Sequence, residues 1–282
     1  MALEAKGWRR STNKKGEKSM MDFKELIDYR KMIDGYLEKV LPPEDRKPQL
    51  LHKAMRYSIF SGGKRLRPLI ILIVGDMLGV DKKKLLPVAC GIELIHNFSL
   101  IHDDLPAMDN DDFRRGKKTC HKKFNETIAI LAGDALLTLG FKLIAETNNC
   151  EMIRATADAI GSEGMAGGQA MDILAKGKKI PPREKRDMDY LKTGKLFQLC
   201  FSIPLYFTKV EKEKKKKILS IGKNFGLAFQ IRDDMEDREG NMDELRRRLN
   251  ILYKKMKKDI IDSFGSKGAL LSYYILDKLY NL

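Results

Sequence analysis

The sequence predicts an all-α protein that folds as a single large helical bundle. Apolar residues recur mostly at three- and four-residue spacing along the 282-residue chain, which is the spacing of amphipathic helices. No segment alternates in the manner of a strand, and no Asn-Gly or Asp-Gly hairpin signal stands out. Several segments are apolar on most faces, which indicates central helices enclosed by outer ones and also suits a dimer interface. The 43% hydrophobic content is enough for such a core.

The first predicted helix runs from Asp22 to Val40, and Pro42 and Pro43 end it. Glycine, proline or polar residues separate the segments that follow. The same periodicity predicts further helical segments at 51–60, 66–79, 84–105, 126–146, 150–175, 185–207, 212–236, 242–262 and 267–280. No internal repeat divides the chain, so residues 21–282 are expected to form one domain.

Residues 1–20 are polar and basic and lack helical periodicity, so they are expected to be a disordered tail or an expression leader. The longest uninterrupted apolar run, Leu69 to Gly75, is far shorter than the roughly 20 residues of a membrane span, which predicts a soluble protein. The four cysteines are well separated and form no C-x-x-C pair. They favour neither a zinc site nor disulfides, and therefore a reduced, cytoplasmic location.

The chain is strongly basic, with 54 lysines and arginines against 39 acidic residues and a net charge of +15. Such a charge suits nucleic acid or an anionic membrane as a partner. The basic residues are scattered, however, and few aromatic residues lie among them. The favoured interpretation is a lysine-rich solvated surface, and no nucleic acid is expected as a partner.

The most informative segment is 102–112, where acidic residues gather at the end of a strongly apolar helix. Asp103 and Asp104 end that helix, and Pro106 favours a turn that brings Asp109 back toward it. Carboxylates this close repel one another unless a cation joins them, and Mg²⁺ prefers such oxygen ligands. A solvated acidic loop is the alternative.

A second acidic cluster lies at 230–237. Asp233 and Asp237 are four residues apart, hence on one face of a helix that is apolar upstream. The two clusters would face each other across a cavity and hold several Mg²⁺ ions. Mg²⁺ usually recruits substrate phosphates to complete its shell, so the pattern indicates a phosphorylated substrate.

Basic residues complete a phosphate site. Residues 62–68 place Lys64, Arg65 and Arg67 at a glycine break that opens a buried helix. Arg114 and Arg115 follow the first acidic cluster, and residues 192–195 put a glycine within a helix, where a ligand could approach closely. Taken singly, each of these basic groups is more often a solvated charge than a ligand. Together they indicate two diphosphate sites, one formed through Mg²⁺ and one directly by lysine and arginine, and no Walker-A or dinucleotide fingerprint competes.

In this order the motifs resemble those of the trans-isoprenyl diphosphate synthases, particularly the short-chain bacterial type represented by farnesyl diphosphate synthase. The resemblance extends from Met21 to Gly240. It rests on G-G-K-R-L-R-P at 62–68, E-L-I-H at 93–96, S-L-I-H-D-D-L-P-A-M-D-N-D-D at 99–112, R-R-G-K at 114–117, L-A-G-D-A-L-L at 131–137, M-A-G-G-Q-A at 165–170, K-T-G at 192–194 and F-Q-I-R-D-D at 229–234. It implies an isoprenoid synthase bundle with a central active-site cavity, and a homodimer.

The resemblance also implies roles for individual residues. Catalysis would depend on Asp103, Asp104, Asp109, Asp233 and Lys192. Three Mg²⁺ ions, which Mn²⁺ could replace, would be held by Asp103, Asp109, Asp233 and Asp237. Isopentenyl diphosphate would be bound by Lys64, Arg67, His96 and Arg115, and the allylic substrate by Arg114, Lys192, Thr193 and Gln230. Without the family, His96 reads more simply as a satisfied core histidine.

The implied activity is a Mg²⁺-dependent condensation of isopentenyl diphosphate with dimethylallyl or geranyl diphosphate, giving mainly farnesyl diphosphate. Phe98 lies five residues, about 7.5 Å along a helix, before Asp103. In the family an aromatic at this offset is associated with stopping at the C15 product, while Ser99 offers no second barrier. The alternatives are a geranylgeranyl or geranyl diphosphate synthase and a non-catalytic regulatory member, although both aspartate motifs stand here.

One departure from the family pattern follows Gly240. The pattern continues there with a glycine- and lysine-rich loop that contains a K-x-T-Y-type segment, and its lysine helps to bind the allylic diphosphate. Here residues 241–245 enter a helical pattern directly. Either the loop is deleted or the chain as written omits a mobile segment, and the second interpretation is favoured because such loops are often missing from crystal structures.

Overall fold

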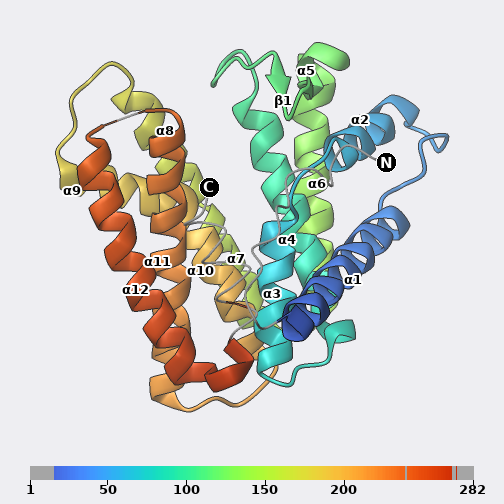
Figure 1. The fold of residues 1–282 in the computed structure, drawn as a ribbon. Coiled ribbons are helices and arrows are strands. Elements are labelled where there is room, and N and C mark those ends of the chain that lie inside the picture. Colours follow the sequence, from blue (N-terminus) through green and yellow to red (C-terminus); the bar gives the residue numbers. More distant parts are fainter. Residues whose placement is uncertain (1–15, 239, 269–270, 272–282) are drawn as a thin grey trace.

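The computed structural model describes residues 16–238, 240–268 and 271, and almost all of them lie in helices (Figure 1). In chain order the elements are α1 (Gly16–Val40), α2 (Gln49–Phe60), α3 (Leu66–Met77), α4 (Lys82–Asp103), the strands β1 (Phe113–Arg114) and β2 (Lys117–Lys118), α5 (Cys120–Lys123), α6 (Glu126–Ala145), α7 (Cys150–Ile160), α8 (Met165–Ala175), α9 (Pro182–Asp189), the π-helical segment η2 (Tyr190–Gly194), α10 (Lys195–Ser202), the 3₁₀ segment η3 (Ile203–Tyr206), α11 (Lys212–Glu236), α12 (Met242–Phe264) and the 3₁₀ segment η4 (Gly265–Gly268). The predicted all-α bundle is confirmed.

Several boundaries differ from the prediction. Helix α1 begins at Gly16 and so includes the end of the segment expected to be a tail. The predicted helix 150–175 is two helices, and the chain turns between them. Gly164 lies in this turn, where a Cβ atom would collide with the backbone of Ala159. The segment 185–207 is also divided, into α9, η2, α10 and η3. Most of the predicted helix 267–280 lies outside the described residues.

The expectation that the chain has no hairpin is wrong at one place. Strands β1 and β2 pair antiparallel, and Arg115 and Gly116 connect them with φ of +54° and +73°. Two successive left-handed residues are the signature of a tight two-residue hairpin turn. Arg-Gly occupies the two turn positions at which Asn-Gly is usual. The Arg115 side chain is held there by a 2.6 Å hydrogen bond from Nη1 to the carbonyl oxygen of Gly62.

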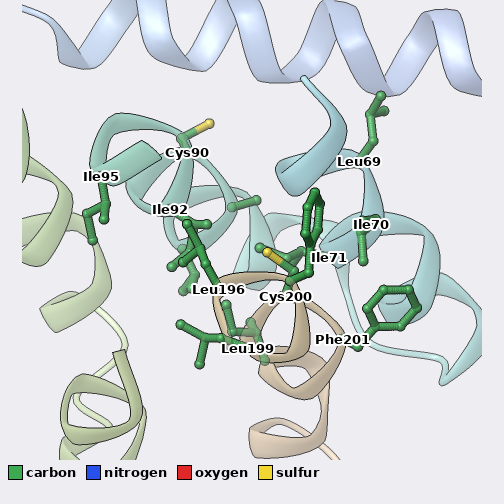
Figure 2. Close-up of a cluster of buried hydrophobic side chains, with 14 of the residues drawn as sticks. Leu69, Ile70, Ile71, Cys90, Ile92, Ile95, Leu196, Leu199, Cys200 and Phe201 are labelled. Atoms are coloured by element: carbon green, nitrogen blue, oxygen red, sulfur yellow. The ribbon is translucent and has the colours of Figure 1, made fainter. Parts of the chain in front are cut away.

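Helix α4 is the central helix of the bundle, and it packs against α1, α2, α3 and α6. It crosses α6 closely where glycines meet, since a Cβ atom at Gly91 would lie 2.8 Å from the carbonyl oxygen of Gly140. Figure 2 shows how α10 completes this core. Its side chains point toward α3 and α4 in a cluster that includes Leu69, Ile70, Ile71, Cys90, Ile92, Ile95, Leu196, Leu199, Cys200 and Phe201.

Two helices of the bundle, α4 and α6, are long and apolar enough to cross a membrane by length and composition alone. Neither helix is one uninterrupted apolar run, because polar residues interrupt both sequences. For α4, 67% of the apolar window is buried within the bundle, as a core helix requires, but the value for α6 is only 39%. Ile130 and Leu131 of α6 are 44% and 47% exposed. One apolar face of α6 is therefore uncovered.

Helices α11 and α12 are joined by a short turn and pack side by side (Figure 1). Gly240 has φ of +86°, and the Oδ1 atom of Asn241 accepts hydrogen bonds from the backbone N–H groups of Asp243 and Glu244 at 3.0 and 3.1 Å. This side chain caps α12 at its first turn. The residue numbers are continuous through the turn. The chain as written thus has no counterpart of the lysine-containing loop between these helices. The interpretation that a mobile segment was omitted stays a prediction.

Candidate active site

The first acidic motif lies where α4 ends and the chain doubles back. Asp103 is the last residue of α4, and the backbone N–H of Asp109 donates to the carbonyl oxygen of Asp103 at 2.9 Å. A second bond, from the N–H of Asn110 to the carbonyl oxygen of Leu105 at 3.1 Å, closes the same loop. The predicted return of Asp109 toward the end of the helix is confirmed. Two carboxylates six residues apart are thereby attached to one rigid turn.

Asp103 faces α8, where it accepts a hydrogen bond from the side-chain amide of Gln169. Burial raises the pKa of Asp103 to about 6, the ammonium of Lys192 opposes this shift, and the negative charge of Asp109 adds to it. The carboxylate is thus a half-buried anion whose charge is incompletely compensated. Such a group has a strong affinity for a cation.

Asp104 points in a different direction from Asp103. Its side chain is buried, and Oδ1 lies 2.6 Å from both Nε and Nη2 of Arg114 on the hairpin. Burial raises the pKa of Asp104, and Arg114 opposes that shift. A paired, buried carboxylate of this kind anchors the arginine. The geometry therefore separates Asp104, which the sequence grouped with the catalytic residues, from Asp103.

Helix α8 and its cap contribute three polar residues that the sequence analysis did not single out, namely Gln169 and Asp172 in the helix and Lys176 directly after it. Lys176 Nζ lies 2.9 Å from Asp109 Oδ1, and Lys192 Nζ lies 2.5 Å from Asp172 Oδ2. Positions 169 and 172 share one face of the helix, and position 176 continues the same spacing in the sequence. That polar stripe was the available signal, but only the fold places it opposite the first acidic motif.

The π-helical segment η2 links the two acidic regions. Burial lowers the pKa of Lys192, but the hydrogen bond and charge of Asp172 outweigh it, so the net pKa is raised and the lysine is charged. On the next residue, Thr193 Oγ1 donates to Gln230 Oε1 of α11 at 3.2 Å. The glycine at 194 was expected to admit a ligand. In the structure Gly226 of α11 packs directly against Gly194, because a Cβ atom at Gly226 would collide with Gly194 Cα. The approach of a ligand to Gly194 stays a prediction.

The second acidic motif lies at the end of α11. Burial raises the pKa of Asp233 to about 6, and the charge of Glu236 adds to the shift. Asp237 is the exposed cap residue of the helix. Asp234 is buried, accepts a hydrogen bond from Gln230 Nε2 at 3.1 Å and lies 3.4 Å from Lys185 Nζ of α9. Of the two adjacent aspartates, Asp233 is thus the one left without an ion pair in the described part of the chain.

A cationic region surrounds His96 on α4. Burial lowers the pKa of His96 well below its usual value, and the charges of Arg67 and Arg115 lower it further, so the ring is neutral. The guanidinium carbon of Arg67 lies 4.4 Å from the centre of the Phe197 ring, and its buried Nε has no hydrogen-bond partner. Lys64 beside them is exposed. Arg115 donates to the carbonyl oxygen of Gly62, and neither Arg115 nor Arg67 forms an ion pair among the described residues, so these arginines suit an anion beside His96. The role of His96 in a diphosphate site stays a prediction.

Arg65, the third cation of that sequence motif, has a different role. Its Nη1 lies 3.1 Å from Glu93 Oε1 and its Nε 2.8 Å from Asp34 Oδ1, and it is buried. Those carboxylates neutralise Arg65, so it holds α1, α3 and α4 together. A pocket lined in part by Asn97, Arg114 and Arg115 opens between α2, α4 and the hairpin, next to the cationic region.

Phe98 and Ser99, the residues predicted to set the length of the product, lie on α4 before the acidic motif. Phe98 is half-buried, and its ring packs edge-on against His102 with the ring centres 5.0 Å apart. His102 in turn contacts the carbonyl oxygen of Ile130 on α6, at 3.1 Å from Nε2, whereas Asp103 faces α8. Ser99 is buried and its hydroxyl donates to the carbonyl oxygen of His96 at 2.9 Å. The chain-length role of both residues stays a prediction.

The acidic residues fit a metal that arrives with its substrate. Within residues 16–238, 240–268 and 271, no three aspartate, glutamate, histidine or cysteine side chains converge to hold a metal alone. Mg²⁺ is typically bound through only one or two carboxylates, with waters and substrate phosphates completing its shell. Asp103 and Asp109 on one turn, and Asp233 and Asp237 at the end of α11, supply such pairs of oxygen ligands.

Comparisons with known proteins agree with this chemistry. A family model described as polyprenyl synthetase matches residues 48–259. Farnesyl diphosphate synthase of Bacillus subtilis (strain 168) is 40% identical over 232 residues, 79% of this chain and 78% of the relative. The enzyme of the same name from Geobacillus stearothermophilus is 45% identical over 216 residues, 74% and 71% of the two chains.

The solved structures give the same result for the fold. A geranyltransferase from Legionella pneumophila superposes with a TM-score of 0.87 at 34% identity, over 94% of this chain and 99% of the other. Farnesyl diphosphate synthases are in general metal-dependent, and prenyl diphosphates are the substrates that suit the family. The chain therefore belongs to the polyprenyl synthetase family and is a trans-prenyltransferase.

Proposed function

We propose that this trans-prenyltransferase condenses isopentenyl diphosphate with dimethylallyl or geranyl diphosphate and makes mainly farnesyl diphosphate. The observation that carries the proposal is the presence of two differently charged halves in one site. Asp103 and Asp233, each with a pKa of about 6, belong to the acidic half. Arg67, Arg115 and a neutral His96 form the cationic half. Two diphosphates, one bound with metal ions and one without, match these halves.

In the acidic half, Asp103 and Asp109 would hold Mg²⁺ from one side and Asp233 and Asp237 from the other. Three Mg²⁺ ions per site are proposed, with Mn²⁺ as a substitute. When bound, the metal ions neutralise the charge that develops on the departing diphosphate. Lys192, fixed by its 2.5 Å bond to Asp172, adds a positive charge beside Asp103.

The remaining residues bind and orient the two substrates. Arg114, fixed by Asp104, together with Thr193 and Gln230, would hold the allylic diphosphate on the acidic side. Lys64, Arg67, His96 and Arg115 would hold isopentenyl diphosphate, with the neutral histidine as a hydrogen-bond donor. The allylic C–O bond then breaks with its electron pair on the diphosphate. The alkene of isopentenyl diphosphate attacks the allylic carbon, and a proton passes to the released diphosphate.

A homodimer in the cytoplasm is part of the proposal. The exposed Ile130 and Leu131 give α6 an apolar face that a second copy would cover. Sedimentation velocity should give twice the monomer mass. A monomer at micromolar concentration would contradict this part.

A second candidate function rests on the short turn between α11 and α12. The loop whose lysine helps to bind the allylic diphosphate in the resembling family has no counterpart between these helices. A non-catalytic regulatory member would tolerate that loss, but the similarity to farnesyl diphosphate synthases supports the enzyme. Geranylgeranyl and geranyl diphosphate are the alternative products.

The test is a product assay with purified protein. Labelled isopentenyl diphosphate is incubated with Mg²⁺ and, separately, with dimethylallyl, geranyl or farnesyl diphosphate, and products are separated by chain length. The proposal expects C15 as the main product from the first two substrates and no product in EDTA. Absence of product with every allylic substrate would favour the regulatory candidate, and a C20 main product would favour geranylgeranyl diphosphate synthesis.

A further inference from the structure

Lys176 is a cation in contact with a proposed metal ligand. It follows directly after α8, and its Nζ lies 2.9 Å from Oδ1 of Asp109. The sequence analysis gave this lysine no role. A metal ion that binds Asp109 must compete with the ammonium for the same carboxylate, so Lys176 and the metal cannot both retain this contact unchanged.

The local backbone leaves Lys176 free to change partners. The residue caps α8 with ψ of 126°, so the chain leaves the helix there, and Gly177 follows with φ of +76° in open space. The side chains of Lys176 and Asp109 are 53% and 36% exposed. An exposed ion pair of this kind shifts an equilibrium only about two- to fivefold. Displacing Lys176 from Asp109 is therefore easy for a divalent cation.

The charges around Asp109 indicate where the lysine goes next. Lys176 Nζ lies 2.9 Å from Asp109 and Lys192 Nζ lies 2.5 Å from Asp172, so each of these lysines has one carboxylate partner. A divalent cation at Asp109 takes that carboxylate from Lys176 and leaves its ammonium without the partner. A diphosphate bound to a metal at Asp109 then lies within reach of the displaced ammonium, because the ammonium started in contact with Asp109.

We propose that Lys176 is an exchangeable cation, paired with Asp109 in the metal-free protein and with the allylic diphosphate once metal ions occupy Asp109. The inference rests on the proposed function. It assigns Lys176 two effects of opposite sign. The lysine weakens the binding of free metal ions and strengthens the binding of the metal-bound diphosphate, whereas a merely structural ion pair would not change both in this way.

The experiment measures metal affinity and substrate affinity separately. Binding of Mn²⁺ to the full chain is followed by the loss of its free electron paramagnetic resonance signal, without turnover. In K176M the dissociation constant for Mn²⁺ alone should fall about two- to fivefold. In steady-state assays the KM of K176M for geranyl diphosphate should rise, while the KM for isopentenyl diphosphate stays unchanged. K176R should retain the values of the natural protein.

K178M is the matched control, because Lys178 is exposed and lies two residues further along the same loop. It should change neither the Mn²⁺ affinity nor the KM for geranyl diphosphate. The proposal is overturned if K176M binds Mn²⁺ no more tightly than the natural protein, or if K178M binds it as tightly as K176M. Failure of the natural protein to make any product would overturn the proposed function instead, because the Mn²⁺ titration does not depend on product formation.

Discussion

The acidic and cationic halves of the site differ in how their charges are compensated. In the acidic half Asp104, Asp109, Asp172 and Asp234 are each within ion-pair distance of a lysine or an arginine. In the cationic half neither Arg67 nor Arg115 has such a partner among the residues that the structure describes. Of the proposed metal ligands, Asp109 must therefore exchange a partner when metal and substrate arrive. The cationic half needs no such exchange before it binds an anion.

This difference predicts that the acidic half carries the largest mutational effects. Replacing Asp103, Asp109 or Asp233 by alanine should lower kcat by about a hundred- to a thousandfold, because each change removes charge compensation at the departing diphosphate. Circular dichroism should show an unchanged fold. Near-normal turnover of any two of these variants at saturating Mg²⁺ would show that the acidic half is misassigned.

Substrate preference should separate the two halves next. R67A should raise the KM for isopentenyl diphosphate about ten- to a hundredfold, the usual effect of losing a charged hydrogen bond, with a smaller change for the allylic substrate. K64A should change the two KM values in the same direction as R67A. R114A should show the opposite bias, since Arg114 is fixed by Asp104 on the acidic side. Equal effects on both substrates would mean that the two halves do not bind separate diphosphates.

The acidic half should also respond to pH through Asp103 and Asp233, whose pKa values burial raises to about 6. Raised carboxyl pKa values stabilise the metal-free fold fully below about pH 4, and this stabilisation is lost as the pH rises through about 6. Mg²⁺ needs the ionised carboxylates, so it should raise Tm at pH 8 and have little effect at pH 5. A Mg²⁺-dependent rise of Tm that is equal at both pH values would argue against this account.

The smallest of the expected mutational effects is on product length. F98A should lengthen the product distribution toward C20, because removing the ring opens space for about one more isoprene unit along α4. Chromatography of the dephosphorylated products measures the shift, with kcat as a check that the variant is active. An unchanged C15 product would show that other residues form the end of the cavity.

Sequence patterns were sufficient where a local rule decides the structure. Helices α3 and α11 lie close to the predicted 66–79 and 212–236, because apolar periodicity and nearby breaks define them. The return of Asp109 toward Asp103 was predicted from Pro106, which is also a local effect. The acidic pairs and the arginines of the two halves were named on the same basis.

Features that depend on distant contacts could not be predicted in this way. The hairpin turn at Arg115 depends on a bond to Gly62, 53 residues away. Lys176 and Asp172 acquire their roles from Asp109 and Lys192, which lie on other elements. Likewise, only the fold distinguishes Asp103, which faces α8, from Asp104, which holds Arg114. Adjacent residues of the same type need tertiary contacts to separate their roles.

The most direct test of the difference between the halves is isothermal titration of the natural protein with isopentenyl diphosphate and with an unreactive allylic thiolodiphosphate. Each ligand is titrated once in Mg²⁺ and once in EDTA. Isopentenyl diphosphate should bind with similar affinity in both, because Arg67, Arg115 and His96 need no metal. The allylic analogue should bind measurably only in Mg²⁺. An equal loss of binding for both ligands in EDTA would contradict the separation into an acidic half and a cationic half.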